Sequence, residues 1–242
     1  MGKRLTKKEW IEQGNALYER KRYEEALHTY ERVIHLDPMD ARGYTGKGLM
    51  LSNLKRDEEA LHAHEKALHL DPTYALAYNN KGYALNNLKR YEEALQTYEK
   101  ALQFGPDKAS IYVGIGNSFR GLKQYEEALH AYEQAIRLDP TNAGGYHGKG
   151  NALNNLKRYE EALQTYEHVV DLNPTYALAH SNKGGVLNNL KRYEEALRAF
   201  ERAIQLDPHL DLAYNGKGNV LSNLKKHQEA LHNYEEAARL DP

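Results

Sequence analysis

The stretch "NNKGYALNNLKRYEEALQTYEKALQFGP", Asn79 to Pro106, decides the fold, because near copies of it recur along the chain. "GKGNALNNLKRYEEALQTYEHVVDLNP" begins at Gly148, and "SNKGGVLNNLKRYEEALRAFERAIQLDP" begins at Ser181. A chain built from one repeated unit buries its core by stacking neighbouring units. All seven prolines follow a single step of 34 residues, at Pro38, Pro72, Pro106, Pro140, Pro174, Pro208 and Pro242.

The prolines divide the chain into seven repeats. In the third repeat, apolar spacing predicts one helix over 76–88, a turn over 89–91 and a second helix over 92–104. The proline that closes each unit ends the second helix, because proline cannot continue a helix. The predicted ranges are an N-terminal leader, 1–6, then repeats 7–40, 41–74, 75–108, 109–142, 143–176 and 177–210, and a truncated seventh repeat, 211–242.

A glycine recurs in every first helix and an alanine in every second helix. A glycine inside a helix costs about 1 kcal/mol relative to alanine, so we expect the paired helices to approach closely there. Aromatic residues of the second helix should fill the space beside this contact. The glycines are Gly14, Gly48, Gly82, Gly116, Gly150, Gly184 and Gly218; the alanines are Ala26, Ala60, Ala94, Ala128, Ala162, Ala196 and Ala230; the aromatic residues are Tyr30, Tyr98, Tyr132, Tyr166, Phe200 and Tyr234.

This pattern resembles the tetratricopeptide repeat family. The family's first aromatic position is held by Trp10, Tyr44, Tyr78, Tyr112, Tyr146 and Tyr214, with His180 as the exception. The resemblance implies an all-α fold, a right-handed α-solenoid of seven 34-residue helix-turn-helix repeats whose concave groove is lined mainly by first helices. It also implies a scaffold that binds protein segments, with no catalysis in the repeats themselves.

Composition narrows the function classes. The formal net charge is -1, which argues against a nucleic-acid-binding protein, since these usually carry a basic excess. The absence of cysteine excludes disulfides and thiolate zinc sites. No apolar run approaches the length of a membrane span. We therefore expect a cytoplasmic protein that binds neither nucleic acid nor membrane.

No arrangement of residues indicates catalysis. The histidines include no pair four residues apart on a helix, and we expect them at the surface rather than in a metal site. The glycine strings around Lys47 and Lys149 lack the serine or threonine of a phosphate-binding loop. The paired glutamates stand at the start of second helices, where the helix dipole favours them. The sequence predicts no catalytic residue, no metal and no cofactor, and hence no enzyme.

The predicted groove is rich in asparagine and poor in acids. Spaced amides can pair with the main chain of an extended segment, although asparagine also serves as a solvated filler on a groove. Because acids are almost missing from the first helices, an acidic protein or peptide partner should be preferred over a basic one. The predicted groove residues are Arg42, Leu76, Asn79, Tyr83, Asn86, Val113, Asn117, Arg120, His147, Asn151, Asn154, Leu178, Asn188 and Asn219.

A lysine stands between the aromatic residue and the glycine in five first helices, on the face that points inward. We expect its stem to pack and its ammonium to reach solvent, where it meets a glutamate of the second helix in the same repeat. Glu31 and Glu133 weaken this hypothesis, because Gln13 and Ile115 replace the lysine in their repeats. The lysines are Lys47, Lys81, Lys149, Lys183 and Lys217, and the glutamates are Glu65, Glu99, Glu167, Glu201 and Glu235.

Three functions stay open on the sequence alone. The first is a scaffold that binds an extended peptide or protein segment in the groove. The second is a structural array that self-associates end to end through an uncapped C-terminal repeat, where Leu221, Leu224, Leu231 and Ala238 are expected to lie uncovered. The third is the non-catalytic repeat domain of a larger enzyme or regulator.

Overall fold

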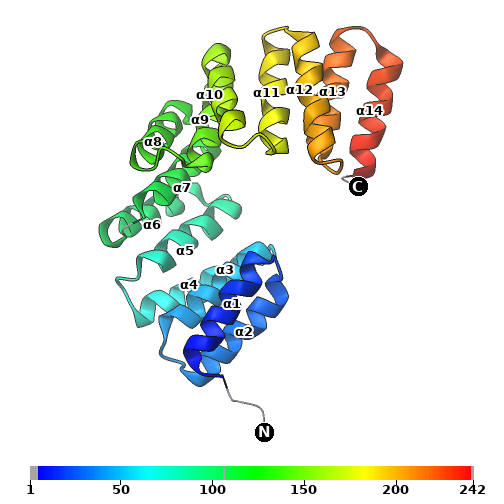
Figure 1. The fold of residues 1–242 in the computed structure, drawn as a ribbon. Coiled ribbons are helices and arrows are strands. Elements are labelled where there is room, and N and C mark those ends of the chain that lie inside the picture. The colour runs from blue at the N-terminus through cyan, green and yellow to red at the C-terminus, as the bar shows by residue number, and fades with distance from the viewer. Residues whose placement is uncertain (1–4, 106, 241–242) are drawn as a thin grey trace. The chain divides into compact units, whose positions relative to one another are not determined.

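The computed structural model describes residues 5–105 and 107–240, and the regular structure within them is α-helical (Figure 1). Predictions that fall on residues 1–4, Pro106 and Pro242 lie outside the described residues. The helices within the described ranges are α1 (Lys7–Glu19), α2 (Tyr23–Leu36), α3 (Ala41–Asn53), α4 (Asp57–Leu70), α5 (Ala75–Asn87), α6 (Tyr91–Phe104), α7 (Lys108–Gly121), α8 (Tyr125–Leu138), α9 (Ala143–Asn155), α10 (Tyr159–Leu172), α11 (Ala177–Asn189), α12 (Tyr193–Leu206), α13 (Asp211–Asn223) and α14 (His227–Leu240).

These helices form two compact units. Unit 1 runs to Gln124 and contains α1 to α7, and unit 2 runs from Tyr125 and contains α8 to α14. Within each unit every helix packs against the helices before and after it, and first helices also touch across the repeat, as α3 does with α5 and α11 with α13. The all-α, repeat-based fold class is confirmed. The division between units falls inside the predicted repeat 109–142, whose repeat boundaries stay predictions.

The third repeat shows how closely the sequence pattern fixes the helices. The observed helices α5 and α6 begin one residue before each predicted helix. Tyr91, which was assigned to the turn, is the first residue of α6 because the turn is shorter than predicted. Arg90 precedes α6 and pairs with Glu93, with 2.7 Å between Nε and Oε1. The same pairing closes the turns at Arg22–Glu25, Arg56–Glu59, Arg158–Glu161 and Arg192–Glu195.

The turn inside each repeat carries a lysine in a left-handed conformation. Lys89 has φ of 61°, and the backbone N–H of Arg90 donates to the carbonyl of Leu85 at 2.9 Å, which closes the end of α5. Glycine is the usual residue at such a helix end, because other residues pay a steric cost there. The other lysines with positive φ are Lys21, Lys55, Lys123, Lys157, Lys191 and Lys225.

The close approach predicted at the repeated glycine is confirmed. A Cβ added to Gly82 in α5 would lie 2.6 Å from the ring of Tyr98 in α6, a distance that real Cβ atoms do not tolerate. The Tyr98 ring is also in contact with Gly114 on the next first helix, α7. One buried ring therefore joins its own repeat to the following one. Rings oppose the equivalent glycine at Gly14, Gly48, Gly150, Gly184 and Gly218.

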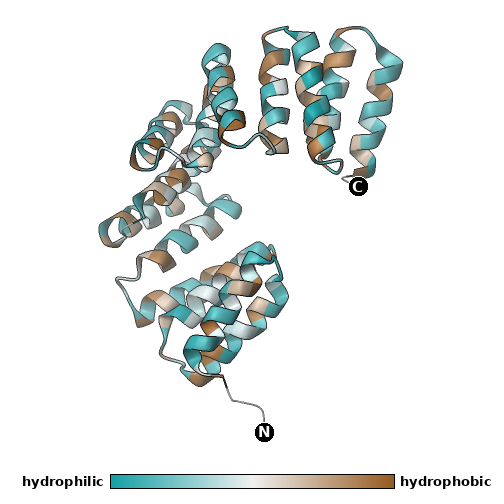
Figure 2. Cartoon of the chain, in the orientation of Figure 1, coloured by the Kyte–Doolittle hydropathy of each residue, from teal (hydrophilic) through white to brown (hydrophobic). Residues whose placement is uncertain are grey.

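Apolar residues are distributed along the helices in the way that stacking requires. Figure 2 shows hydrophobic and hydrophilic residues alternating along each helix, so that no helix is apolar on all sides. Among the described residues, no helix is both long enough and apolar enough to cross a membrane. Burial in each unit comes from helix-to-helix contact between repeats.

Candidate binding groove

Unit 2 contains a groove of ≈ 250 Å³ between its first helices. Side chains of α9, α11 and α13 form its walls, and the rings of Tyr166 and Phe200 reach it from the second helices. No charged side chain is among the described residues that line it, which makes it a neutral, amide-rich surface. The lining residues are Asn151, Asn154, Tyr166, Ser181, Asn182, Gly185, Val186, Phe200, Leu212, Asn215, Gly216 and Asn219.

Three of the predicted groove residues meet in this groove, namely Asn151, Asn154 and Asn219. The predicted set also named His147, Leu178 and Asn188 in unit 2, but the groove lining does not include them. The remaining predicted residues belong to unit 1. As ligand-binding residues, all of them stay predictions. The residues that line the groove but do not belong to the predicted set are Tyr166, Ser181, Asn182, Gly185, Val186, Phe200, Leu212, Asn215 and Gly216.

Tyrosines of the second helices hold the groove asparagines. The hydroxyl of Tyr166 donates to Oδ1 of Asn151 at 2.7 Å, and that of Tyr234 donates to Oδ1 of Asn219 at 2.8 Å. Tyr30 makes the same bond to Asn15 in unit 1 at 2.6 Å. Burial raises the pKa of Tyr30 to about 12, so that its hydroxyl stays protonated near neutral pH. An asparagine at this position therefore has a structural role besides any contact with a ligand.

The sixth repeat lacks both partners of this bond. Phe200 stands where the other repeats of unit 2 carry tyrosine, and Gly185 replaces the asparagine on α11. A Cβ added to Gly185 would meet nothing within 4 Å, so the packing does not require glycine here. Because Phe200 has no hydroxyl, the residue at position 185 need not be an asparagine that accepts from it. This does not explain why that residue is glycine, which costs about 1 kcal/mol relative to alanine in a helix.

Other asparagines connect neighbouring repeats. Nδ2 of Asn189 donates to Oδ1 of Asn154 at 2.9 Å, and Nδ2 of Asn223 donates to Oδ1 of Asn188 at 2.9 Å. Nδ2 of Asn182 lies 3.4 Å from Nδ1 of His147. The row of asparagines therefore fastens the first helices of unit 2 to one another.

The first helices of unit 1 present a different surface. Leu76 and Tyr83 lie on one face of α5 and are 50% and 47% exposed. Nδ2 of Asn86 donates to the carbonyl of Gly114 at 3.1 Å, and its Oδ1 accepts from Ser118 at 2.7 Å, so this amide ties α5 to α7. Apolar side chains rather than free amides dominate this part of the predicted groove. Asn79, Val113 and Asn117 are half-buried, and Arg120 is exposed.

Arg42, one of the predicted cationic contacts, is already paired. Its Nη2 lies 2.6 Å from Oδ2 of Asp40, and Nζ of Lys7 lies 2.8 Å from the same oxygen. The Arg42 hydrogen bond, with that of Lys7, holds the pKa of the Asp40 carboxyl well below its usual range. Asp40 also begins α3 by accepting from the backbone N–H of Arg42 at 3.0 Å. The charge of Arg42 is therefore largely cancelled.

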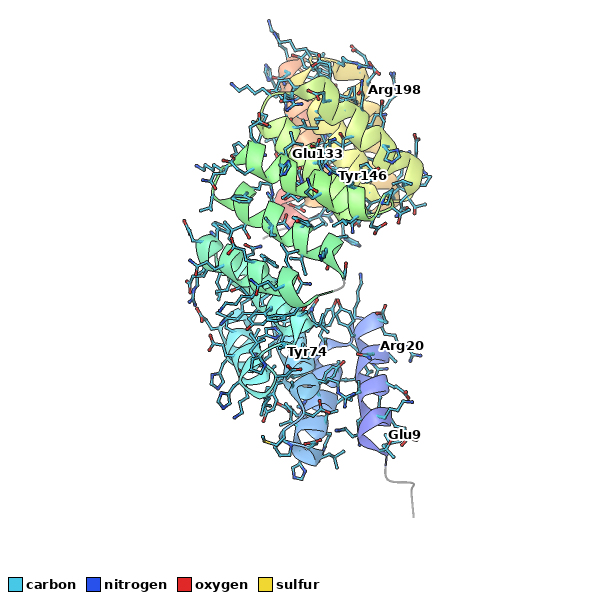
Figure 3. All side chains as sticks on the ribbon, turned by 90° about the vertical axis from the view of Figure 1, so that its left-hand side faces the viewer. Glu9, Arg20, Tyr74, Glu133, Tyr146 and Arg198 are labelled. Carbon is cyan, nitrogen blue, oxygen red and sulfur yellow. The ribbon has the colours of Figure 1, made fainter. Side chains whose placement is uncertain are left out.

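The repeated lysines do meet carboxylates, but the predicted partner is wrong by one repeat. Nζ of Lys149 lies 2.9 Å from Oε1 of Glu133, labelled on α8 in Figure 3, and not beside Glu167 of its own repeat. The cause is that this lysine projects toward the preceding second helix. Glu31 and Glu133 are explained at once, because the lysine of the next repeat pairs with each. The other pairs are Lys47–Glu31, Lys81–Glu65, Lys183–Glu167 and Lys217–Glu201, at 2.9–3.0 Å.

His64 contradicts the prediction that the histidines lie at the surface. It occupies the ring position held by Tyr98 in the next repeat, and it is fully buried against Gly48. Among the described residues, neither of its ring nitrogens has a hydrogen-bond partner, and Oγ of Ser52 and Nδ2 of Asn80 are also buried without one. Burial, with the nearby charge of Lys81, lowers the pKa of His64 to about 3. The ring is therefore neutral in the folded chain.

The described part of the chain contains no group of three or more histidines and acids that could hold a metal ion. In five second helices, the second glutamate of the first turn pairs with the arginine that precedes the helix, as Glu93 does with Arg90. That hydrogen bond lowers the pKa of the Glu93 carboxyl. These carboxylates are suited to closing turns rather than to proton transfer.

Comparison with protein families gives one consistent result. Five models described as tetratricopeptide repeat or TPR repeat match residues 14–55, 41–74, 73–141, 113–177, and 177–210 together with 212–242. No curated protein matches the chain.

Solved structures agree on the fold. The crystal structure of the APC/C hetero-tetramer Cut9-Hcn1 has a TM-score of 0.84 at 16% identity, over 96% of this chain and 46% of that chain. A tetratricopeptide repeat protein from Parabacteroides merdae has a TM-score of 0.76 at 14% identity, over 98% of this chain and 93% of that one. YrrB, described as a TPR protein with an unusual peptide-binding site, has a TM-score of 0.55 at 29% identity, over 78% of this chain and 97% of that one. This chain thus spans less than half of the Cut9-Hcn1 chain that it matches.

Proposed function

The chain belongs to the tetratricopeptide repeat family, and from this premise we propose that it is a protein-interaction scaffold that binds an extended polypeptide segment in the groove of unit 2. The observation that carries the proposal is the neutral groove between α9, α11 and α13, lined by amides that can bond to a main chain. The peptide-binding site named for YrrB gives further support. We assign no enzymatic activity to the repeats, and a cytoplasmic setting stays a prediction.

The preference for an acidic partner rests on fewer cations than the sequence indicated. Arg42 is neutralised by Asp40, Arg120 is exposed on α7 in unit 1, and no charged side chain is among the described residues that line the groove of unit 2. A partly exposed ion pair contributes about 0.2–1 kcal/mol. We therefore propose that acidic residues in the partner improve binding only severalfold, and that shape and main-chain contacts provide most of the affinity.

Filling the groove should weaken binding. Purified chain would be panned against displayed random dodecapeptides, and the affinity of the best binder measured by titration calorimetry. Asn215→Trp puts a large side chain into the groove from an exposed position of α13, and we expect it to weaken binding at least tenfold, as roughly 1.4 kcal/mol of lost contacts requires.

Gln164→Trp is the matched control, since Gln164 is exposed on α10 outside the groove. It should bind the peptide as the unchanged protein does. Equal affinity of the Asn215→Trp variant and the control would show that the peptide binds elsewhere.

A second candidate function, self-association, is favoured by the outer face of α14. Leu231 is 57% exposed, whereas Leu27 and Leu163, at the same place in their repeats, are 4% and 6% exposed because a following helix pair covers them. We expect the mass measured by analytical ultracentrifugation to rise with concentration, and Leu231→Glu to suppress that rise. A constant monomeric mass at millimolar concentration would exclude this function.

A further inference from the structure

Three of the five groove asparagines of unit 2 are fixed in one orientation. Oδ1 of Asn151 accepts from Tyr166, Oδ1 of Asn219 accepts from Tyr234, and Oδ1 of Asn154 accepts from Nδ2 of Asn189. Each carbonyl oxygen is therefore engaged by the protein. An amide carries its NH2 on the other branch of the same planar group, so fixing the oxygen also fixes the direction of the two N–H donors.

These three amides therefore present donors, rather than free acceptors, along this wall. Asn151, Asn154 and Asn219 all line the groove, and no aspartate or glutamate is among its described lining residues. Ser181, which is 5% exposed, also lines the groove and carries a hydroxyl that can donate.

Gly185 lets a ligand come close to this wall. It lies on α11 in the lining of the groove, and the space in front of it is open for 4 Å beyond the position of a Cβ. Packing inside the protein does not require glycine here, unlike at Gly150, where a Cβ would lie 2.6 Å from the Tyr166 ring. A glycine without an internal reason is typical of a place where another backbone approaches.

We propose that Tyr166 and Tyr234 are positioning residues, which turn Asn151 and Asn219 so that their N–H donors face the groove, and that the ligand is an extended main chain whose carbonyl oxygens accept from them as it passes Gly185. This inference rests on the proposed function and adds its chemistry to it. The contact at Asn151 and Asn219 is made to acceptors of the ligand and not to its N–H groups. The tyrosine hydroxyls act on the ligand through these asparagines.

Exchange of asparagine for aspartate tests the direction of these bonds. Asn151→Asp and Asn219→Asp keep an acceptor for the tyrosine hydroxyl but replace the groove-facing donor with an oxygen. The probe is the best dodecapeptide from the display experiment, resynthesised without lysine or arginine and capped at both ends. We expect each variant to weaken its binding roughly three- to tenfold, the range for one net hydrogen bond.

Asn15→Asp is the matched control. Asn15 accepts from Tyr30 as Asn151 does from Tyr166, but it belongs to unit 1. This control should bind the probe with unchanged affinity, and all three variants should keep the melting temperature of the parent within a few degrees. A loss in the control equal to that in Asn151→Asp would overturn the assignment to unit 2.

A double-mutant cycle tests the role of Tyr166. Tyr166→Phe keeps the buried ring and releases the Asn151 amide, so we expect weaker binding in the parent and no further effect in an Asn151→Ala background. Additive losses would mean that Tyr166 does not act through Asn151. An ester in place of one ligand amide, which makes the carbonyl a weaker acceptor, should weaken the probe, while N-methylation at that amide should be tolerated.

These outcomes separate the two proposals. If the capped probe binds, is blocked by Asn215→Trp and is insensitive to Asn151→Asp and Asn219→Asp, the groove is the binding site but the donor assignment is wrong. If only the uncapped probe binds, the acceptor is a terminal carboxylate and the main-chain assignment is wrong. If Asn215→Trp has no effect on any binder, the proposed function itself fails.

Discussion

Lowering the pH from 7.5 to 4.5 is expected to destabilise the folded chain by about 3 kcal/mol through His64 alone, at about 1.4 kcal/mol for each pH unit below the unfolded-state pKa. His64 is fully buried without a hydrogen-bond partner among the described residues. Burial lowers its folded-state pKa from 6.5 to about 3. The unfolded chain therefore binds a proton at pH 4.5 that the folded chain does not.

The sign follows from the two pKa values. Above pH 6.5 the ring is neutral in both states, and the full stability is present. As the pH falls from 6.5 toward 3, the unfolded state is progressively favoured by protonation. Urea unfolding at the two pH values, followed by circular dichroism, measures the loss.

His64→Tyr should remove most of this loss. Tyrosine already occupies this position in the fifth repeat, as Tyr166, and the repeat that follows it carries Asn182. His64 is placed in the same way, because the repeat that follows it carries Asn80 at the equivalent position. His62→Tyr is the control, because His62 is exposed on the same helix. The control should keep the pH dependence of the parent. An equal loss of stability in His64→Tyr and in the parent would show that the ring is not a neutral buried group.

The second large effect is a difference of sign between two glycine-to-alanine changes in unit 2. Gly150→Ala places a Cβ 2.6 Å from the buried Tyr166 ring, and overpacking of this kind costs about 1–3 kcal/mol. Gly185→Ala meets nothing within 4 Å and should gain about 1 kcal/mol from helix propensity. Thermal unfolding of both variants against the parent measures the two shifts.

The Gly185 change also separates stability from binding. A more stable Gly185→Ala variant that binds the display peptide more weakly supports the close approach of a ligand at that residue. Destabilisation by Gly185→Ala would contradict the open space seen in front of α11. A stabilised Gly150→Ala variant would mean that the Tyr166 ring can move aside.

The helices and their pairing within a repeat could be predicted because each 34-residue repeat contains the complete pattern of a helix pair. The 34-residue spacing of the prolines predicted the bounds of α5 and α6 to within one residue. The close approach of Gly82 to Tyr98 lies within one repeat, so it could be predicted without knowing how the repeats stack. Contacts between repeats were harder, because they depend on how far one helix pair is rotated against the next. This is why the lysine of one repeat was assigned to the wrong glutamate.

Some of the missed features left a signal in the sequence. Glu31 and Glu133, present without a lysine in their own repeats, indicated that the pairing crosses the repeat boundary. His64 aligns with Tyr98 and the other buried rings, which indicated burial. The left-handed turn lysine carried no such signal, since lysine is not a residue that this conformation favours. Only the backbone shows it.

The lysine–glutamate pairs make the two sides of a repeat chemically different, which decides what happens when a whole repeat is deleted. A repeat carries a lysine that fits its predecessor and a glutamate that fits its successor. Excision of residues 41–74 would bring Lys81 against Glu31 and restore a pair. Excision of residues 75–108 would instead bring Ile115 against Glu65 and leave that carboxylate without a lysine, as Glu99 is in the intact chain. The first deletion therefore keeps a lysine–glutamate pair at the new joint, whereas the second keeps the unpaired joint that precedes α7.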